Sequence, residues 1–310
     1  MKAIGLTGPD YMPRLFDIDD PVASPGGVVV EVLAASVNDF DRAAVEGRMA
    51  LTRPLDPVLL GRDFVGRVTA VGDDVHYIDA GMYVAGTTEV GRSGTFADSV
   101  EVPAELLAPV PDGIDVAEAA GVGLAAITAL DAVGVLGATN LASTVIYGPV
   151  SEVGGFALQL AKARGAVVAV VTPPAQADLA WALGADEVIA EGADAMQTIQ
   201  AVRDFFGSGV GNAIHIPGDV SVAAGVLRPG GKFTSVTDTA TLAIRPDVEY
   251  IPTVVVPSGH KLADLLFKVA AQRLRSCVGR TFSFDQAGSA LRSDGNSAGG
   301  RIVLDRKSVV

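Results

Sequence analysis

The chain has 310 residues, and its 23 lysines and arginines against 36 aspartates and glutamates give a formal net charge of −13. Hydrophobic residues make up 49% and charged residues 19%, which is typical of a folded globular protein and excludes a disordered chain. The acidic balance and the lack of a Lys/Arg-rich run argue against nucleic acid or an anionic membrane as the main partner. At about 150 residues per domain, the length predicts two domains or one large one.

The cysteines, histidines and apolar runs narrow the possibilities further. Cys277 is the single cysteine, so the sequence excludes an intrachain disulfide and a multi-cysteine metal site. His76, His215 and His260 show no metal-ligand spacing, and we expect no metal site. Apolar stretches are interrupted before roughly 18 residues, and the start MKAIGLTG lacks a basic stretch followed by a long apolar run. We therefore expect a soluble, cytoplasmic protein without a membrane partner.

The first part of the chain, to about residue 111, alternates short Val-rich runs with turn residues. Such runs occur within residues 26–37, 63–75, 82–91 and 94–111, and Gly, Pro and Asp bound them. Short runs bounded by turn formers are typical of β-strands. This part of the chain is therefore predicted to form a compact β-rich unit.

The pattern changes near Pro111, where an Ala-rich stretch with a start signal at Asp115 predicts helical segments. Strands are then predicted at residues 143–148, 166–172, 186–190, 212–217 and 232–237. Helices are predicted between them at residues 153–166, 177–185 and 195–206, and a later one at residues 261–275. Strands that alternate with helices form βαβ units, so a doubly wound α/β domain with a parallel sheet is expected.

A glycine-rich turn, GPVSEVGG at residues 148–155, joins the first of these strands to the following helix. A turn of this kind presents backbone N–H groups and a helix dipole to a pyrophosphate, which predicts a dinucleotide site. The alternative is that Gly148, Gly154 and Gly155 serve only the close packing of helix against strand.

The order of several motifs resembles the medium-chain dehydrogenase/reductase superfamily, in its zinc-free quinone oxidoreductase branch. The stretches that carry the resemblance include SVNDFDRAAVEG (36–47), LLGRDFVGRVTAVGDDV (59–75), VGGFALQLAKARGA (153–166), LGADEVI (183–189) and TFSFDQAGSALR (281–292). The resemblance implies an α/β protein in which a GroES-like β-rich catalytic domain, residues 1–115 and 251–310, flanks a Rossmann domain at residues 116–250. It also implies an enzyme that transfers hydride from a nicotinamide, commonly NADPH, to a quinone, enone or similar activated carbonyl compound.

The zinc-dependent relatives have a Cys where this chain has Asn38, and a His where it has Arg62, and Asp63 follows as the acidic position. The lobe that bears four cysteines is missing. Amide and guanidinium groups do not replace thiolate and imidazole ligands, so the resemblance implies a zinc-independent enzyme.

The resemblance also supplies candidate catalytic residues, since it places Asn38, Asp41 and Thr128 near the nicotinamide. Asn38 is expected to donate a hydrogen bond to a substrate carbonyl. The chain lacks the Tyr that some relatives have near Met49, so Asp41 is a candidate general acid, alongside a bound water or solvent. The alternative is that Asn38 and Asp41 only hold a turn.

The cofactor-binding residues expected from the resemblance are Thr128, Gly148, Ser151, Val153, Gly154, Thr172 and Gln176. NADPH is the expected cofactor and NADH is compatible, but two departures weaken the site. Ser151 and Glu152 stand where the usual fingerprint has glycines, and residues 172–176 contain no Arg or Lys to hold a 2′-phosphate. Cofactor binding is therefore expected to be weak or lost.

Two functions follow from this pattern. One is an NAD(P)H-dependent oxidoreductase acting on a small-molecule substrate; the other is a non-redox descendant that binds a ligand or partner, or works without a cofactor. A homodimer is expected at family level, with YIPTVVVP (250–257) extending a sheet across a two-fold axis. The alternative is that this stretch is an internal strand.

Overall fold

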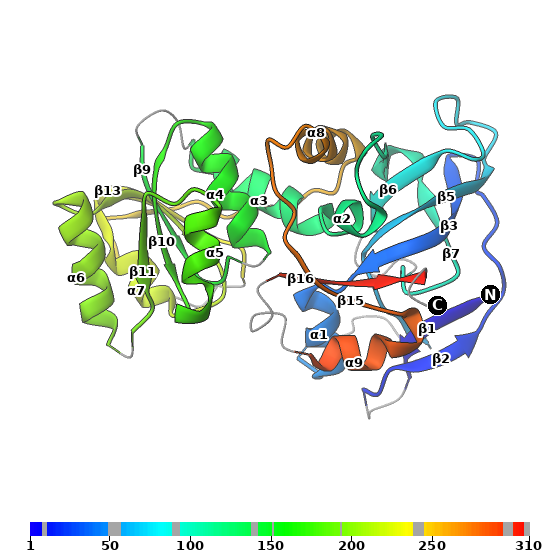
Figure 1. The fold of residues 1–310 in the computed structure, drawn as a ribbon, viewed down its shortest axis with the longest axis horizontal. Helices are drawn as coiled ribbons and strands as arrows, with labels where there is room; N and C mark the ends of the chain where they lie inside the picture. Colours follow the sequence, from blue (N-terminus) through cyan, green and yellow to red (C-terminus); the bar gives the residue numbers. More distant parts are fainter. Residues whose placement is uncertain are drawn as a thin grey trace. The chain divides into compact units, whose positions relative to one another are not determined.

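The computed structural model describes residues 1–7, 11–48, 57–88, 94–137, 142–150, 152–192, 194–237, 245–293 and 300–306. The chain divides into two compact units (Figure 1). Unit 1 consists of Met1–Leu124 and Pro257–Val310, and unit 2 of Ala125–Val256. These boundaries lie later in the chain than the ones predicted at residues 115 and 250.

Unit 1 is built on a seven-stranded sheet with the strand order β15-β16-β3-β5-β6-β8, in which β7 also pairs with β3. Its strands are β3 (Gly27–Ser36), β5 (Asp63–Val71), β6 (Tyr83–Thr87), β7 (Ser99–Pro103), β8 (Leu107–Pro109), β15 (Val278–Phe282) and β16 (Arg301–Asp305). β16 pairs antiparallel with β3, so the C-terminal segment completes a sheet that the first hundred residues begin. A smaller sheet contains β2 (Arg14–Asp17), β1 (Lys2–Leu6) and β4 (Val58–Leu59).

Short helices cover the β-structure of unit 1. They are α1 (Asp39–Val45), α2 (Val116–Ala120), α8 (Gly259–Ala270) and α9 (Ala287–Arg292), with the 3₁₀ turns η1 (Ala104–Leu106) and η3 (Phe284–Gln286). α8 buries Leu262, Leu265, Leu266 and Val269, which share one face at helical spacing. α2 packs on β3 and β5, so the first helical segment after residue 115 still belongs to unit 1. The change from strands to helices therefore does not mark the boundary between the units.

Unit 2 contains a six-stranded parallel sheet with the order β11-β10-β9-β12-β13-β14. The strands are β9 (Ser143–Tyr147), β10 (Val167–Thr172), β11 (Glu187–Ala190), β12 (Val210–His215), β13 (Leu227–Ser235) and β14 (Glu249–Tyr250). Counted from β9, this order is 3-2-1-4-5-6, the order of a doubly wound dinucleotide-binding sheet. The chain reverses direction across the sheet between β9 and β12, where such sheets bind their ligands.

The helices of unit 2 are the end of α3 (Gly123–Val135), α4 (Val153–Ala163), α5 (Ala177–Ala182), α6 (Ala195–Phe206) and α7 (Val220–Gly225), with the turn η2 (Pro174–Gln176). Figure 1 shows α4 and α5 on one face of the sheet and α6 on the other. β10 is buried on both faces after its first residue, which explains its unbroken run of apolar residues. The doubly wound domain predicted from the sequence is confirmed. No helix in the described part of the chain is long and apolar enough to cross a membrane.

The stretch at residues 250–257 differs from the predicted extended strand. Only Glu249–Tyr250 forms β14, and residues 251–257 lie outside any strand. Pro252 and Pro257 have no N–H to donate to a sheet, which accounts for the early end of the strand. Val254 and Val256 are 68% and 55% exposed, so this stretch is an apolar edge of unit 2.

Candidate functional site

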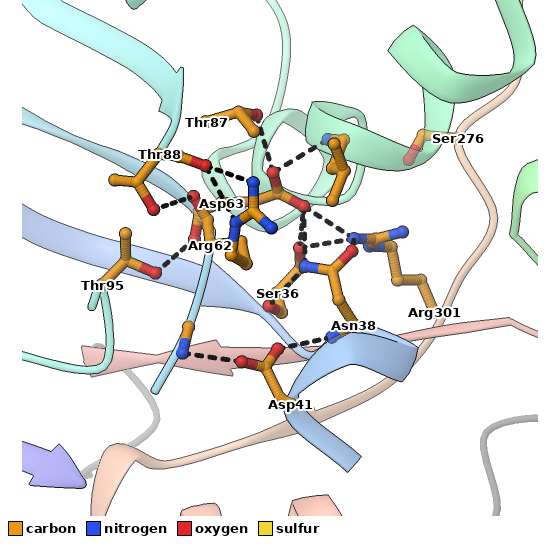
Figure 2. A network of polar contacts seen from close by, with 12 residues as sticks. Ser36, Asn38, Asp41, Arg62, Asp63, Thr87, Thr88, Thr95, Ser276 and Arg301 are labelled. Atoms are coloured by element: carbon orange, nitrogen blue, oxygen red, sulfur yellow. Dashed lines mark hydrogen bonds and ion pairs between the residues drawn. The ribbon is translucent and has the colours of Figure 1, made fainter. Parts of the chain in front are cut away.

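A buried carboxylate, Asp63 at the start of β5, is the centre of a polar network in unit 1 (Figure 2). Its Oδ2 accepts hydrogen bonds from Ser36 Oγ at 3.0 Å, Asn38 Nδ2 at 3.0 Å and Arg301 Nη2 at 2.7 Å. Its Oδ1 accepts from Thr87 Oγ1 at 2.7 Å and the backbone N–H of Leu124 at 2.8 Å. Asp63 and Arg301 are 0% and 1% exposed, so the two opposite charges are buried together.

The register of the sheet brings this network together. Ser36 is directly opposite Asp63, and Asp63 is opposite Thr87, while Arg301 is the first residue of β16. Gly123 allows the closest approach, because a Cβ on this residue would lie 2.3 Å from the carboxyl carbon of Asp63. The network therefore ties three strands and the first turn of α3 to one carboxylate.

The side-chain amide of Asn38 belongs to the same network. Its Nδ2 donates to Asp63 Oδ2 and, at 3.4 Å, to the carbonyl of Ser36, and its Oδ1 accepts from Arg301 at 2.6 Å. Both ends of the amide therefore have protein partners, and the residue is 5% exposed. Donation to a substrate carbonyl would require the exchange of one of these bonds, and the catalytic role of Asn38 stays a prediction.

Asp41 lies in the first turn of α1, where its carboxylate joins the helix to a neighbouring loop. Oδ2 accepts from the backbone N–H of Asn38 and Oδ1 from that of Gly61, both at 2.8 Å. Burial raises the pKa of Asp41 to about 6, against the opposing effect of these hydrogen bonds. The side chain is 1% exposed and joins α1 to the loop at Gly61, which is a structural role. Its role as a general acid stays a prediction.

The residues at the former zinc-ligand positions do not suit a zinc ion. Arg62 donates from Nε and Nη2 to the carbonyl of Thr88, at 2.8 and 2.5 Å, and its guanidinium carbon lies 4.9 Å from the ring centroid of Phe40. A guanidinium and an amide are not zinc ligands, and Asp63 is engaged by the donors described above. In the described ranges, no three His, Cys, Asp or Glu side chains form a group that could hold a metal ion.

The glycine-rich turn of unit 2 follows β9, at the point where the strand order reverses. Gly148 has φ +126°, and a Cβ there would approach Ile216 Cβ to 2.8 Å. At Gly154 and Gly155 a Cβ would lie 2.2 Å from the carbonyl oxygen of Pro149 and 2.4 Å from that of Val150. These two glycines therefore satisfy close packing of α4 on the turn, whereas Gly148 gives the turn a conformation that L side chains rarely adopt.

The other cofactor residues expected from the sequence lie in several parts of unit 2. Val153 begins α4, whose eleven residues give it a full N-terminal dipole, and Thr128 lies in α3 with 8% exposure. Ser151 lies outside the described residues. The N-terminal dipole of α4 suits a diphosphate, while Gly148 itself is packed closely against Ile216 and Pro217.

Thr172 and Gln176, the two polar candidates for the adenosine end, are both buried. Gln176 Oε1 accepts from the backbone N–H of Val150 at 2.7 Å, so its side chain is bonded to the glycine-rich turn itself. The hydroxyl of Thr172 is buried without a hydrogen-bond partner in the described structure. Since Thr172 is 0% and Gln176 1% exposed, a nucleotide would reach either one only after a local rearrangement.

A cluster that the sequence reading missed lies at the carboxyl edge of the parallel sheet. Tyr147, the last residue of β9, donates its hydroxyl to Glu191 Oε1 and accepts from the backbone N–H of Asp219 at 3.2 Å. Burial and the neighbouring Glu191 raise the pKa of Tyr147, so the hydroxyl remains a donor. His215 lies alongside, with its ring centroid 6.0 Å from that of Tyr147, and burial lowers the pKa of His215.

Glu191 is the member of this cluster closest to the expected adenosine end. Its backbone N–H donates to the carbonyl of Thr172 at 2.9 Å, which holds it beside the end of β10. The sequence carried one signal for it, since Glu191 directly follows the strand predicted at residues 186–190.

These two units define the class of protein: a GroES-like β-rich unit, made from both ends of the chain, with a Rossmann unit inserted between them. A sequence profile for the alcohol dehydrogenase GroES-like domain matches residues 24–112, and one for the zinc-binding dehydrogenase matches residues 153–245. The chain belongs to the medium-chain dehydrogenase/reductase superfamily, as the sequence predicted.

Individual relatives agree with this assignment. The chain is 27% identical over 327 residues, 91% of its length and 82% of the relative's, to the mouse protein named NAD(P)H oxidoreductase RTN4IP1, mitochondrial. It is similar in fold to the quinone oxidoreductase of Coxiella burnetii, with a TM-score of 0.84, 24% identity and coverage of 98% and 99% of the two chains. A mycobacterial protein solved with NADPH gives the same TM-score and identity, with coverage of 98% and 100%.

Proposed function

We propose that this protein is a zinc-independent oxidoreductase that binds a nicotinamide dinucleotide in unit 2 and reduces a quinone, enone or similar activated carbonyl compound. The observation that carries the proposal is the turn at Gly148, placed where the strand order of a doubly wound sheet reverses. The names of the mouse and Coxiella relatives, and the NADPH in the mycobacterial structure, support it. The donor set at Asn38, Arg62 and Asp63 supports zinc independence.

The residues of unit 2 divide the work of binding. The first turn of α4, beginning at Val153, would hold the diphosphate through its N–H groups and the helix dipole, since the N–H of Gly148 is bonded to the carbonyl of Val171. A bound dihydronicotinamide supplies the hydride. The protein itself needs to orient the dinucleotide and to exclude water from it. The polar network around Asp63 has a different role, which is to stabilise the fold of unit 1.

Glu191 favours NADH over the NADPH expected from the sequence. A carboxylate near the end of the second strand suits the ribose hydroxyls of NADH and repels a 2′-phosphate. At about 8 Å and an effective dielectric of about 20, each extra negative charge costs about 2 kcal/mol, or about 30-fold in affinity. No Arg or Lys lies within residues 172–176 to offset this repulsion.

A titration with each nucleotide tests the proposal. Trp181 lies on α5 in unit 2 and is 49% exposed, so its fluorescence reports binding in this unit together with the melting temperature. We expect NADH to raise the melting temperature and to bind at least tenfold more tightly than NADPH. Glu191→Gln should reduce the difference in affinity between NADH and NADPH, with Glu187→Gln, at a half-buried position of β11, as the matched control. Failure of both nucleotides at millimolar concentration would remove the oxidoreductase proposal.

The second candidate function, a non-redox ligand- or partner-binding protein, is favoured by Gln176. Its side chain already occupies the N–H of Val150 in the glycine-rich turn. Gln176→Ala frees that N–H and separates the two candidates. If nucleotides bind only to this variant, the turn of the natural chain is closed to them and the second candidate is correct.

The homodimer and the cytoplasmic location stay predictions. For the location, the mouse relative is named as a mitochondrial protein. For the homodimer, the exposed Val254 and Val256 support an association of two chains through this edge of unit 2.

A further inference from the structure

Unit 1 contains a cavity of about 310 Å³ beside its small three-stranded sheet. β1, residues 13–15, residues 96–98, η3 with α9, and Arg306 after β16 line the cavity. Figure 1 shows β1, β2 and α9 on the same side of this unit. Small-molecule sites begin at about 300 Å³, so the cavity has room for a small organic ligand.

The inner wall of the cavity is apolar. Ile4 is 8% exposed, and Phe96 and Ala287 are 1% exposed, so these side chains belong to the core of unit 1 and give a firm surface. Leu15 pairs with Ile4 on the neighbouring strand and lines the same cavity, yet it is 60% exposed. An apolar ligand body would cover Leu15 and the wall together, which is favourable because it removes apolar surface from water.

The charged side chains at the cavity favour an anion. Lys2, Arg14 and Arg306 line it, against Asp98 and Asp285. This positive surplus contrasts with the net charge of −13 for the whole chain. Both oxygens of Asp98 are engaged, one by the backbone N–H of Lys2 and the other by Arg306, each at 2.6 Å. Burial acts to raise the pKa of Asp98, but the hydrogen bonds that it accepts from Lys2 and Arg306 lower it, so Asp98 remains ionised.

Arg306 supplies the specific observation. Its guanidinium carbon lies 4.7 Å from the ring centroid of Phe284, which fixes the plane of the group, and its Nη2 is bonded to Asp98. The Arg306 side chain is 33% exposed and lines the cavity, so its guanidinium keeps surface that a ligand can reach.

We propose that this cavity binds a small amphipathic monocarboxylate. The carboxylate accepts from the exposed part of the Arg306 guanidinium, and the apolar body covers Ile4, Phe96 and Leu15. Guanidinium suits this head group because its planar N–H fork matches the two oxygens of a carboxylate. The proposal concerns unit 1 alone and does not depend on the binding of a nucleotide.

Binding of 2-naphthoate to the full chain, followed by calorimetry, tests the proposal, with 2-naphthamide as the neutral probe of the same shape. We expect 2-naphthoate to bind at least about tenfold more tightly than the amide, since a charge-assisted bond is lost with the amide. This comparison needs no variant. Equal affinity of the two probes, or no binding of either at millimolar concentration, would overturn the proposal.

Two variants locate the bound probe. Arg306→Met keeps an unbranched side chain over Phe284 and should weaken 2-naphthoate about tenfold while leaving 2-naphthamide unchanged. Gly288→Leu should block both probes, because it fills the cavity from α9; the nearest atom to a new Cβ there is 3.6 Å away, on the flexible end of Arg292. Gly134→Ala, at an open helical position in unit 2, is the control. Unchanged 2-naphthoate binding in Gly288→Leu would place the probe elsewhere and refute the assignment.

Discussion

The buried pair of Asp63 and Arg301 gives the sharpest prediction for stability. Arg301→Met removes the guanidinium that donates to Asp63, Ser36 and Asn38, and leaves an apolar side chain of similar length. Breaking a buried pair costs about 3–5 kcal/mol, because the remaining charge stays buried without its counterion. Asp63 keeps neutral donors, Thr87 and the N–H of Leu124 among them, so we expect a loss of about 3 kcal/mol.

Asp63→Asn should cost more than Arg301→Met. It removes the carboxylate that forms the ion pair with Arg301, and it turns an amide N–H₂ toward the donors that now bond to Asp63. We expect a loss of about 5 kcal/mol for this variant. The double variant should cost at least about 2 kcal/mol less than the sum of the two single ones, because no unpaired charge then remains.

Hydrogen exchange measured by mass spectrometry suits this test, since it reports the free energy of opening segment by segment. Peptides from β3, β5 and β16 cover the network, and peptides from β9 and β10 in unit 2 give an internal reference. Arg67→Met is the matched control on β5: its ion pair with Glu31 is 3.0 Å long, its side chains are 51% and 44% exposed, and a change below about 1 kcal/mol is expected. Single variants that lose no more stability than this control, or losses that simply add in the double variant, would show that Asp63 and Arg301 do not stabilise unit 1 as a buried pair.

Three further predictions follow. The pKa of Asp41 is raised to about 6, so near pH 5 the folded state binds more protons than the unfolded state. The stability that this group contributes is therefore complete below about pH 4 and is lost as the pH rises through about 6. In urea unfolding, the difference in stability between wild type and Asp41→Asn should decrease between about pH 5 and about pH 7.5. An unchanged difference would exclude Asp41 as the titrating group. Gly154→Ala should destabilise the protein by about 1–3 kcal/mol, since its Cβ would lie 2.2 Å from a backbone oxygen, and Gly134→Ala should not. Val254→Lys should convert a dimer into a monomer in light scattering, and a mass near 32 kDa already in wild type would remove the dimer.

The sequence was most informative where periodicity and turn residues decide the structure. The strands β9 to β13 and the helices α4, α5 and α6 follow from apolar runs, helical spacing and glycine stops, because βαβ units repeat one local pattern, whereas α7 was not predicted. The glycine-rich turn was found for the same reason. Within one chain only Glu249–Tyr250 of the stretch at residues 250–257 pairs as a strand, and the extension of a sheet across a two-fold axis stays a prediction.

The polar networks were not predictable, because they depend on the register between distant segments. Arg301 and Asp63 are far apart in sequence, and only the pairing of β16 and β5 with β3 brings the charges together. Gln176 was expected to face a nucleotide, and nothing in its neighbours indicated that it turns toward Val150. The bond from Tyr147 to Glu191 likewise joins the ends of two strands that are separated in the sheet by β10.

The occupancy of the Gly148 turn by a dinucleotide is tested most directly by hydrogen exchange in the presence and absence of saturating NADH. We expect slower exchange in peptides that cover the end of β9 and the first turn of α4, with the peptides of the Asp63 network unchanged. Unchanged exchange in these peptides at a saturating concentration of NADH would contradict the binding of a dinucleotide at this turn.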